Sequence, residues 1–475
     1  MLLRVFLLTF ILLIVHITAD GASAYYFDHF DIANGLSQNT VTCIHQDRRG
    51  FMWFGTKNGL NRYDGYVFQT YSRNDGFSGL GNSIIYCMAE SGNDIWVGTD
   101  KGVWILNNTT GRFRFLDCRL PNGAILDYTI NKIAFYSTEV WILTANGIYI
   151  LERGNKKLIA LETRLKHSLP VSVTYRFTPV DLYSDGGRMW ITVPFLGILE
   201  YAKGQFSLHR LGEKVRATSI LRKNNLLFVG TLSDGLAVIN VKKGTTVFHS
   251  LKAIDTHENS LIRVIANIDG NVWVGTEDGI FVYDMAKEKI TDHISTENAD
   301  PYSLANNAVY SIFQDSSGGI WVGTYFGGIN LIPKNGIVFE KYYQIPEAGS
   351  IQGQRIREIV AEPSGNLWIA TEDNGLNYFD AENRKFRHYS MSTSGIHLSY
   401  SNIQCLNLAG DELWIGYFTK GIDRLNIKTG KVRHYETLNC PTLDNNDIFS
   451  IYTDLSNTTW IGTSTGVLKY NTQTD

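Results

Sequence analysis

The stretch Trp96–Val103 reads Trp-Val-Gly-Thr-Asp-Lys-Gly-Val, and it decides the fold because the chain repeats it. Trp273–Ile280 and Trp321–Gly328 are close copies, and the pattern Trp-φ-Gly-Thr-x-x-Gly-φ, in which φ is apolar, recurs ten times at intervals of roughly 45 residues. Looser copies begin at Trp53, Trp141, Trp190, Phe228, Trp368, Trp414 and Trp460. A repeat of this length, built from short β segments, predicts the blades of a β-propeller.

One repeat contains the strands of one antiparallel blade. Alternating or apolar runs predict four strands, and a turn with Gly follows the second of them. In the first repeat these segments are Val41–Gln46, Phe51–Thr56, the hairpin Lys57–Gly59, Leu60–Asp64 and Val67–Tyr71. Nine of the ten tryptophans of the chain occupy the same repeat position. We therefore expect these tryptophans to be core residues wedged between neighbouring blades, and not ligand contacts.

The order of the strands indicates how the repeats close. Tyr26–Ile32 resembles the outer strands Phe386–Tyr389 and Val432–Tyr435, but it precedes its own blade. A strand in that position can complete the last blade of a ring. We therefore expect an all-β chain with one complete seven-bladed propeller over residues 25–334 and three blades of an incomplete second propeller over residues 335–475. In the alternative, Val338–Tyr343 finishes the seventh blade and leaves the N-terminal strand without a sheet.

The first 24 residues have the pattern of a signal peptide: a basic start, an apolar run over residues 5–15 and the small residues Ala22-Ser23-Ala24. We expect cleavage after residue 24 and a mature chain in the periplasm; an uncleaved membrane anchor is the alternative. No other apolar run approaches the ~20 residues that a membrane span needs. A net charge of −3 with interspersed signs argues against nucleic acid as a partner.

The five cysteines do not form the spacing of a disulfide framework, nor of a metal site with the histidines. Cys43, Cys87 and Cys405 fall in the first strand of a blade, where small core side chains are expected. Cys118 and Cys440 fall in loops between blades and could be exposed. We expect no metal and no cofactor.

Residues 30–41 read FDIANGLSQNTV and residues 46–65 read QDRRGFMWFGTKNGLNRYDG. Together with the signal peptide and the Trp-φ-Gly-Thr series, they resemble the periplasmic sensor region of hybrid two-component systems from polysaccharide-degrading bacteria. The repeats of that family are called two-component regulator propeller repeats. The resemblance covers residues 25–470, and it implies fourteen repeats in two propellers, then a β-sandwich, a membrane helix, a kinase, a receiver and a DNA-binding domain.

Ten repeats are found here and none of the later parts. The resemblance therefore implies the ligand-sensing part of a hybrid regulator without its kinase output, and not an enzyme. It also implies that the ligand is an oligosaccharide released from glycans. A homodimer is a further partner that the two-propeller architecture allows.

Propeller ligands usually bind over one face of the ring, and we expect the Gly-Thr-x-x-Gly hairpins to lie on that face. Sugars bind to flat apolar rings with polar groups beside them. Aromatic residues are unusual in turns, so Phe195, Tyr325 and Phe326 are the candidate sugar platforms, and Lys57, Glu277 and Asp278 are the candidate polar contacts. Alternatively, the rings pack on neighbouring loops and the acidic residues only form turns.

Two other classes of function remain open at this point. A secreted propeller enzyme that acts on polysaccharide would need two carboxylates within about 5–10 Å of each other on this face, and no such cluster stands out from the repeat background. A scaffold for protein–protein contact is the other class.

Overall fold

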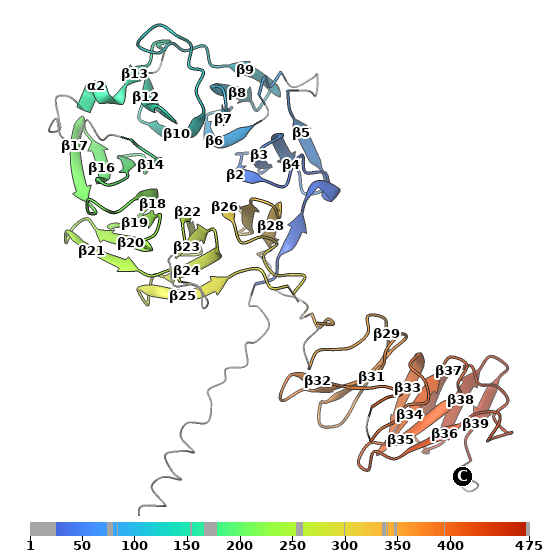
Figure 1. Cartoon of the computed structure of the whole chain (residues 1–475). Helices are drawn as coiled ribbons and strands as arrows, with labels where there is room; N and C mark the ends of the chain where they lie inside the picture. The colour runs from blue at the N-terminus through green and yellow to red at the C-terminus, as the bar shows by residue number, and fades with distance from the viewer. Residues whose placement is uncertain are drawn as a thin grey trace, which may run out of the picture. The chain divides into compact units, whose positions relative to one another are not determined.

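The computed structural model describes residues 25–471 except 74–78, 83, 153, 166–177, 253–259, 299, 335–338, 340, 346–348 and 394. The predicted signal peptide, residues 1–24, lies outside the described residues. The described residues form ten antiparallel sheets, and the chain divides into two units, Met1–Ile337 and Val338–Asp475 (Figure 1). The β-propeller that the repeat predicts is confirmed.

The first unit contains seven four-stranded sheets and two short helices in its described part. The helices are η1 (Ile32–Asn34) and α2 (Leu161–Leu165). The strands are β1 (Asp28–Phe30), β2 (Val41–Gln46), β3 (Met52–Thr56), β4 (Gly59–Tyr63), β5 (Phe68–Tyr71), β6 (Ile85–Ser91), β7 (Asp94–Thr99), β8 (Val103–Asn107), β9 (Arg112–Phe115), β10 (Ile130–Tyr136), β11 (Glu139–Thr144), β12 (Gly147–Glu152), β13 (Ile159–Ala160), β14 (Asp181–Ser184), β15 (Met189–Val193), β16 (Gly197–Ala202), β17 (Gln205–Arg210), β18 (Ala217–Lys223), β19 (Leu226–Thr231), β20 (Leu236–Asn240), β21 (Thr245–His249), β22 (Ile262–Ile268), β23 (Asn271–Thr276), β24 (Gly279–Asp284), β25 (Lys289–Ile294), β26 (Val309–Gln314), β27 (Ile320–Thr324) and β28 (Ile329–Ile332).

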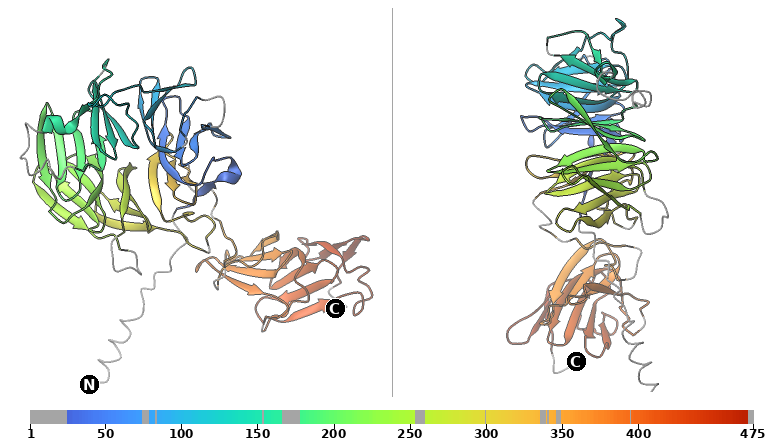
Figure 2. Two further views of the ribbon diagram at one scale, coloured as in Figure 1. Left: turned by 45° about the horizontal axis from the view of Figure 1, so that its top comes forward. Right: turned by 90° about the vertical axis from the view of Figure 1, so that its left-hand side faces the viewer.

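The sheets of the first unit are arranged in a closed ring. One edge strand of each sheet lies nearest the centre, as Figure 1 shows for β2, β6, β10, β14, β18, β22 and β26. Each of these inner strands contacts the inner strand of the next sheet, and β26 contacts β2. Figure 2 shows the same ring from two further sides, with the sheets side by side in a single layer.

The ring is closed by a strand from the N-terminal end of the chain. β1 pairs antiparallel with β28, with Phe30 opposite Ile329 and Asp28 opposite Leu331. The alternative, in which residues 338–343 finish this sheet, does not hold, because β28 lies between β27 and β1. Lys341–Tyr343 is in no strand, and residues 338 and 340 lie outside the described part.

The repeated tryptophan packs between sheets. Trp53 of the first sheet lies in a cluster with Leu80, Ile85 and Ile95, which belong to the second sheet or to the loop leading to it. Its indole N–H donates to the Asp47 carboxylate at 2.8 Å, so the one polar group of this buried ring has a hydrogen-bond partner. Wedged tryptophans therefore bind the blades to one another, as the sequence predicts.

The glycine of the repeat allows the inner strands to approach. A Cβ on Gly55 would lie 2.5 Å from the Cys43 sulfur and 2.8 Å from a methyl carbon of Ile85 in the next sheet. Cys43, Cys87 and Cys405 fill this narrow space in the core, as expected. All five cysteines are free thiols.

One expectation about the cysteines was wrong: Cys118 is buried, in a cluster with Leu120 and Leu126. Its loop folds back on the loop near Lys156, where the Arg119 N–H donates to the Lys156 carbonyl at 2.8 Å. Those backbone bonds hold the Cys118 loop against the sheet. The thiol is therefore buried even though Cys118 lies in a loop.

The second unit contains three sheets in its described part, in a row in which β29 contacts β33 and β33 contacts β37. The third sheet has three strands and the other two have four. The strands are β29 (Ile356–Ala361), β30 (Leu367–Thr371), β31 (Gly375–Asp380), β32 (Lys385–Tyr389), β33 (Ile403–Ala409), β34 (Glu412–Tyr417), β35 (Ile422–Asn426), β36 (Val432–Tyr435), β37 (Ile448–Thr453), β38 (Thr459–Thr463) and β39 (Val467–Lys469).

A polar residue on the third strand of several sheets fixes the loop that enters the sheet. In the first sheet Asn61 does this, and its amide nitrogen donates to the Ser37 hydroxyl at 2.8 Å. In the second unit the equivalent residue is the fully buried Asp423, which accepts bonds from the Ser399 hydroxyl and from Nδ1 of His434, the latter at 2.8 Å. A buried carboxylate needs such partners to remain charged.

This pair makes the second unit pH-sensitive. The hydrogen bond to Asp423 raises the pKa of His434 above its ordinary value, although partial burial opposes the shift. Protonated His434 therefore stabilises the fold fully below the unfolded-state pKa of about 6.5, and this contribution is lost as the pH rises through the raised folded-state pKa. We expect amide protection of the second unit, measured by hydrogen exchange, to fall across that range. In His434→Asn the fall should be absent; an equal fall in that variant would contradict the assignment.

Candidate functional site

A β-bulge recurs at the same place on the inner strands. The pairing register shifts between the first and third residues, as between Val41 and Cys43 of β2 and between Val309 and Ser311 of β26. A bulge re-aims a side chain away from the sheet. In the first unit the bulged residues are Thr42, Tyr86, Asn131, Thr218, Arg263 and Tyr310.

The bulges and the Gly-Thr-x-x-Gly hairpins lie on one face of the ring. The antiparallel register places Val41, at the start of the inner strand, opposite Thr56, directly before the hairpin. The same pairing recurs in the other sheets, for example Val309 with Thr324. We call the surface formed by the bulged residues and the hairpin residues the axial face.

Three consecutive sheets of the ring bring cations and tyrosine rings together on the axial face. The Arg263 guanidinium lies 4.4 Å from the ring centre of Tyr310, and the rings of Tyr310 and Tyr325 are 5.2 Å apart. The Lys57 ammonium lies 4.1 Å from the ring centre of Tyr325 and donates to its hydroxyl at 2.7 Å. We call Arg263, Tyr310, Tyr325 and Lys57 the cation–tyrosine ladder. Each cation–ring contact contributes about 0.5–2 kcal/mol.

The side chains of the ladder differ in how many of their polar groups and ring faces already contact other residues of the chain. Arg263 forms an ion pair with the Glu277 carboxylate. Burial raises the pKa of Tyr310, so its hydroxyl stays protonated and can donate. The ring of Tyr325 faces Lys57 and Tyr310, whereas Phe326, edge-on to Tyr325 at 4.5 Å, is 69% exposed. Phe326 is therefore the ring with the most surface open to a ligand.

The structure brings four of the six predicted site residues into one cluster: Lys57, Glu277, Tyr325 and Phe326. Asp278 is next to Glu277, and its carbonyl accepts a bond from Nε2 of His293 at 2.6 Å. One carboxylate oxygen of Asp278 is buried and has no hydrogen-bond partner within the described part of the chain.

Phe195 does not join the cluster. It lies on the hairpin between β15 and β16, three sheets from the hairpins of Lys57 and Tyr325 and two from that of Glu277, and its neighbour is the Arg216 guanidinium at 5.7 Å. Its φ of 63° is left-handed, which is unusual for a bulky residue.

The sequence analysis missed the bulged residues, above all Arg263 and Tyr310. A signal for them exists in the repeat: they directly follow the β-branched residue that starts most inner strands, as in Ile262-Arg263 and Val309-Tyr310. Aromatic or charged residues at that position are therefore candidates for the axial face, beside the hairpin residues.

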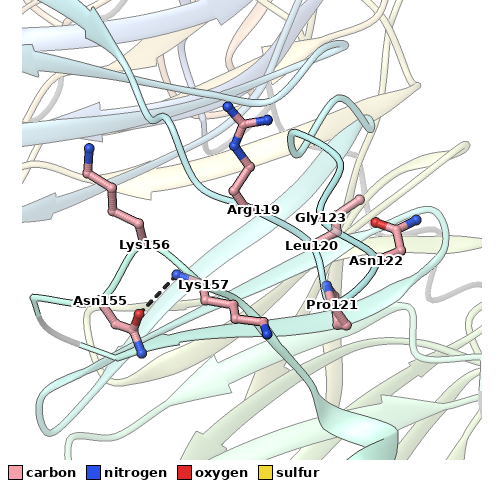
Figure 3. A pocket seen from close by; sticks show the side chains of 8 residues that line it. All are labelled: Arg119, Leu120, Pro121, Asn122, Gly123, Asn155, Lys156 and Lys157. Atoms are coloured by element: carbon pink, nitrogen blue, oxygen red, sulfur yellow. Dashed lines mark hydrogen bonds between the residues drawn. The ribbon is translucent and has the colours of Figure 1, made fainter.

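Away from the axial face, the loops around β9 and β13 form an open pocket, shown in Figure 3. Its lining includes three cations, Arg119, Lys156 and Lys157, and no aromatic ring. Arg119 has a carboxylate neighbour, Asp117, at 3.7 Å. Exposed cations without an aromatic ring beside them are more typical of a solvated surface than of a sugar site.

Within the ranges that the structure describes, no group of three or more His, Cys, Asp or Glu side chains could hold a metal ion. Of the helices in those same ranges, none is both long and apolar enough to cross a membrane.

Comparison with known proteins agrees with the architecture. Residues 35–58 and 303–326 match the family model of the two component regulator propeller. Over 52 residues the chain is 44% identical to histidine kinase P4 of Formosa agariphila, a stretch that is 11% of this chain and 4% of the kinase.

Two solved structures from B. thetaiotaomicron are similar in fold. Both are extracellular domains assigned to hybrid two component systems. The first is 24% identical with a TM-score of 0.66, and the match covers 95% of this chain and 61% of that one. The second is 22% identical with a TM-score of 0.54, covering 95% and 66%. The chain thus spans less than two thirds of the length of the first of these domains.

Proposed function

We propose that this chain, which carries two-component regulator propeller repeats, is the extracytoplasmic sensor part of a hybrid two-component system and binds an oligosaccharide on the axial face of its first ring. The matched repeats and the extracellular location of the solved relatives support the sensor role and a periplasmic location. The signal peptide pattern of residues 1–24 supports the same location.

One observation carries the oligosaccharide proposal: the exposed ring of Phe326 beside the cation–tyrosine ladder. A sugar offers an apolar C–H face and a rim of hydroxyls. Phe326 provides a flat apolar surface, and the Tyr325 hydroxyl and Lys57 ammonium provide polar groups next to it. The side chains of the ladder already hold one another in place, so binding orders few additional groups.

An enzyme that cleaves polysaccharide is the less favoured function. Such an enzyme needs one carboxylate free to act as an acid and a second one nearby. Glu277 is held by Arg263, so it acts as a partner that positions the guanidinium. The sheets and loops that the structure describes form propeller blades, and none of them forms a kinase domain.

The test is calorimetric titration of the purified chain with a panel of oligosaccharides. We expect one glycan class to bind, and Phe326→Ala to weaken its binding about 10-fold, which corresponds to the loss of one aromatic contact. Phe248→Ala is the matched control, because Phe248 is an exposed ring on the outer strand β21 and its loss should not change binding.

Two results would count against the proposal. If no oligosaccharide of the panel binds to protein that circular dichroism shows to be folded, this chain does not bind an oligosaccharide and the proposal is wrong. Binding that Phe326→Ala and Phe248→Ala leave equally unchanged would place the ligand away from the ladder.

A further inference from the structure

The hydrogen-bonding groups that remain free in the cation–tyrosine ladder are mostly donors. A neutral sugar and an acidic sugar offer the same apolar C–H face to a ring such as Phe326. They differ at the rim: the hydroxyls of a neutral sugar both donate and accept, whereas the ionised carboxylate or sulfate of an acidic sugar only accepts. The free groups beside Phe326 therefore distinguish the two classes of sugar.

Arg263 keeps most of its donors free. Its Nε donates to the Glu277 carboxylate. Among the described residues, no acceptor lies within hydrogen-bond distance of its terminal nitrogens Nη1 and Nη2, and the side chain is 34% exposed. Two such nitrogens form a planar fork that can hold both oxygens of a carboxylate at once. Glu277 and the ring of Tyr310 hold the guanidinium in place and leave this fork open.

Lys57 is the second cation with free donors. An ammonium has three N–H groups, and one of those on Lys57 is directed at the Tyr325 hydroxyl at 2.7 Å. In the described ranges Lys57 forms no ion pair with a carboxylate, and the residue is exposed. The hydroxyl of Tyr310 also has no hydrogen-bond partner in the part of the chain that the structure describes. A ligand rich in acceptors would satisfy these groups.

The charges around the ladder favour an anion. Two cations, Arg263 and Lys57, lie beside one carboxylate, Glu277, which already gives an oxygen to Arg263. Asp278 follows Glu277, but its carbonyl accepts a bond from His293 of the outer strand β25, so this residue lies toward the outside of the sheet. One positive charge, that of Lys57, is therefore left without an opposite charge.

We infer that the oligosaccharide held on the axial face is acidic, with a carboxylate or a sulfate against Lys57 and the terminal nitrogens of Arg263. This inference rests on the proposed oligosaccharide function and adds the class of the sugar. The apolar face of the sugar chain lies on Phe326, as it would for a neutral sugar. A charge-assisted hydrogen bond is roughly twice as strong as a neutral one, so the acidic group decides which glycan binds.

The test is calorimetric titration of the whole chain with two matched pairs of oligosaccharides. The first pair is oligogalacturonate and its carboxyl-reduced form, in which each carboxylate is replaced by a CH2OH group. The second pair is a sulfated galactan oligosaccharide and its desulfated form, which tests sulfate without a carboxylate. We expect the acidic member of one pair to bind about 10-fold or more tightly than its neutral member. This preference should weaken as the salt concentration rises, because salt screens exposed charges.

Three variants assign the preference to the ladder. Lys57→Met removes the charge and keeps a side chain of similar length, so it should weaken binding of the acidic member about 10-fold. Lys57→Arg keeps the charge and should retain the preference. Lys243→Met is the matched control, because Lys243 is exposed on the turn between β20 and β21, at the opposite end of β20 from its axial hairpin. It changes the net charge by the same amount and should bind like the natural chain.

Failure of this inference and failure of the proposed function give different results. If the neutral members bind as tightly as the acidic ones, the ligand is an oligosaccharide but not an acidic one, and the inference is wrong. Equal weakening by Lys57→Met and Lys243→Met would also overturn it, because the net charge of the chain would then attract the acid. If both pairs fail to bind and a neutral glycan of the wider panel binds, the inference is wrong and the function stands. If no glycan binds, both are wrong.

Discussion

Replacing Phe27 and Phe30 together by alanine is expected to lower the free energy of unfolding of the first unit by on the order of 5 kcal/mol. Phe27 is buried in the cluster that contains Leu304 and Ile312, and its N–H donates to the Tyr302 carbonyl at 2.9 Å. A large buried ring cut back to a methyl group leaves a cavity, which costs about 3–5 kcal/mol by itself.

Phe30 adds to this effect because it joins the last sheet to the first. Its ring is stacked on Trp321 at 6.2 Å, and it contacts Tyr63 at 5.5 Å and Phe68 at 6.0 Å. Each aromatic pair contributes about 0.5–1.5 kcal/mol beyond its buried area. Without these rings β1 is held only by its backbone bonds to β28 and by the bond between His29 and the Ser303 carbonyl, at the place where the ring is closed by a distant part of the chain.

The measurement is denaturant unfolding, with hydrogen exchange to assign the transition to the first unit. The matched control is the double change of Val247 and Phe248 to alanine, on the outer strand β21 of an internal sheet. Both of those side chains are exposed, so the control should stay within about 1 kcal/mol of the natural sequence. Equal losses in the two double variants would show that β1 is no more important than any other outer strand.

Trp273→Ala is expected to cost about 3–5 kcal/mol of the stability of the first unit. The indole is buried between two sheets, in a cluster with Ile280 and Ile312, and Tyr25 lies edge-on to it at 5.5 Å. Removal leaves a cavity that the rigid sheets on either side cannot fill by small movements.

Trp460→Ala is the control with the same residue at the same repeat position. Because Trp460 is 38% exposed, its removal should cost the second unit about 1 kcal/mol or less. Similar losses for the two tryptophans would mean that the repeat position stabilises its own sheet, and not the contact between sheets.

The repeat, and with it the propeller, follows from residue spacing alone. Tryptophan, glycine and threonine recur at a fixed spacing because each has a local or nearest-neighbour task. The tryptophan packs on the next sheet, the glycine admits the next inner strand, and the threonine closes the hairpin, as Thr56 does on the Gly59 carbonyl at 2.9 Å. The likeness of Tyr26–Ile32 to other outer strands also identified the strand that closes the ring.

Which side chains meet depends on the closed ring and cannot be read from the repeat. The hairpin residues Lys57 and Tyr325 are 268 positions apart in the chain, and they meet because the first and last sheets of a closed ring are neighbours. For the same reason Phe195, chosen by the same sequence criterion, lies three sheets away from them. Arg263 and Tyr310 are recognised as site residues only from the β-bulges. A register shift is a property of two paired strands, so the sequence of one strand does not reveal it.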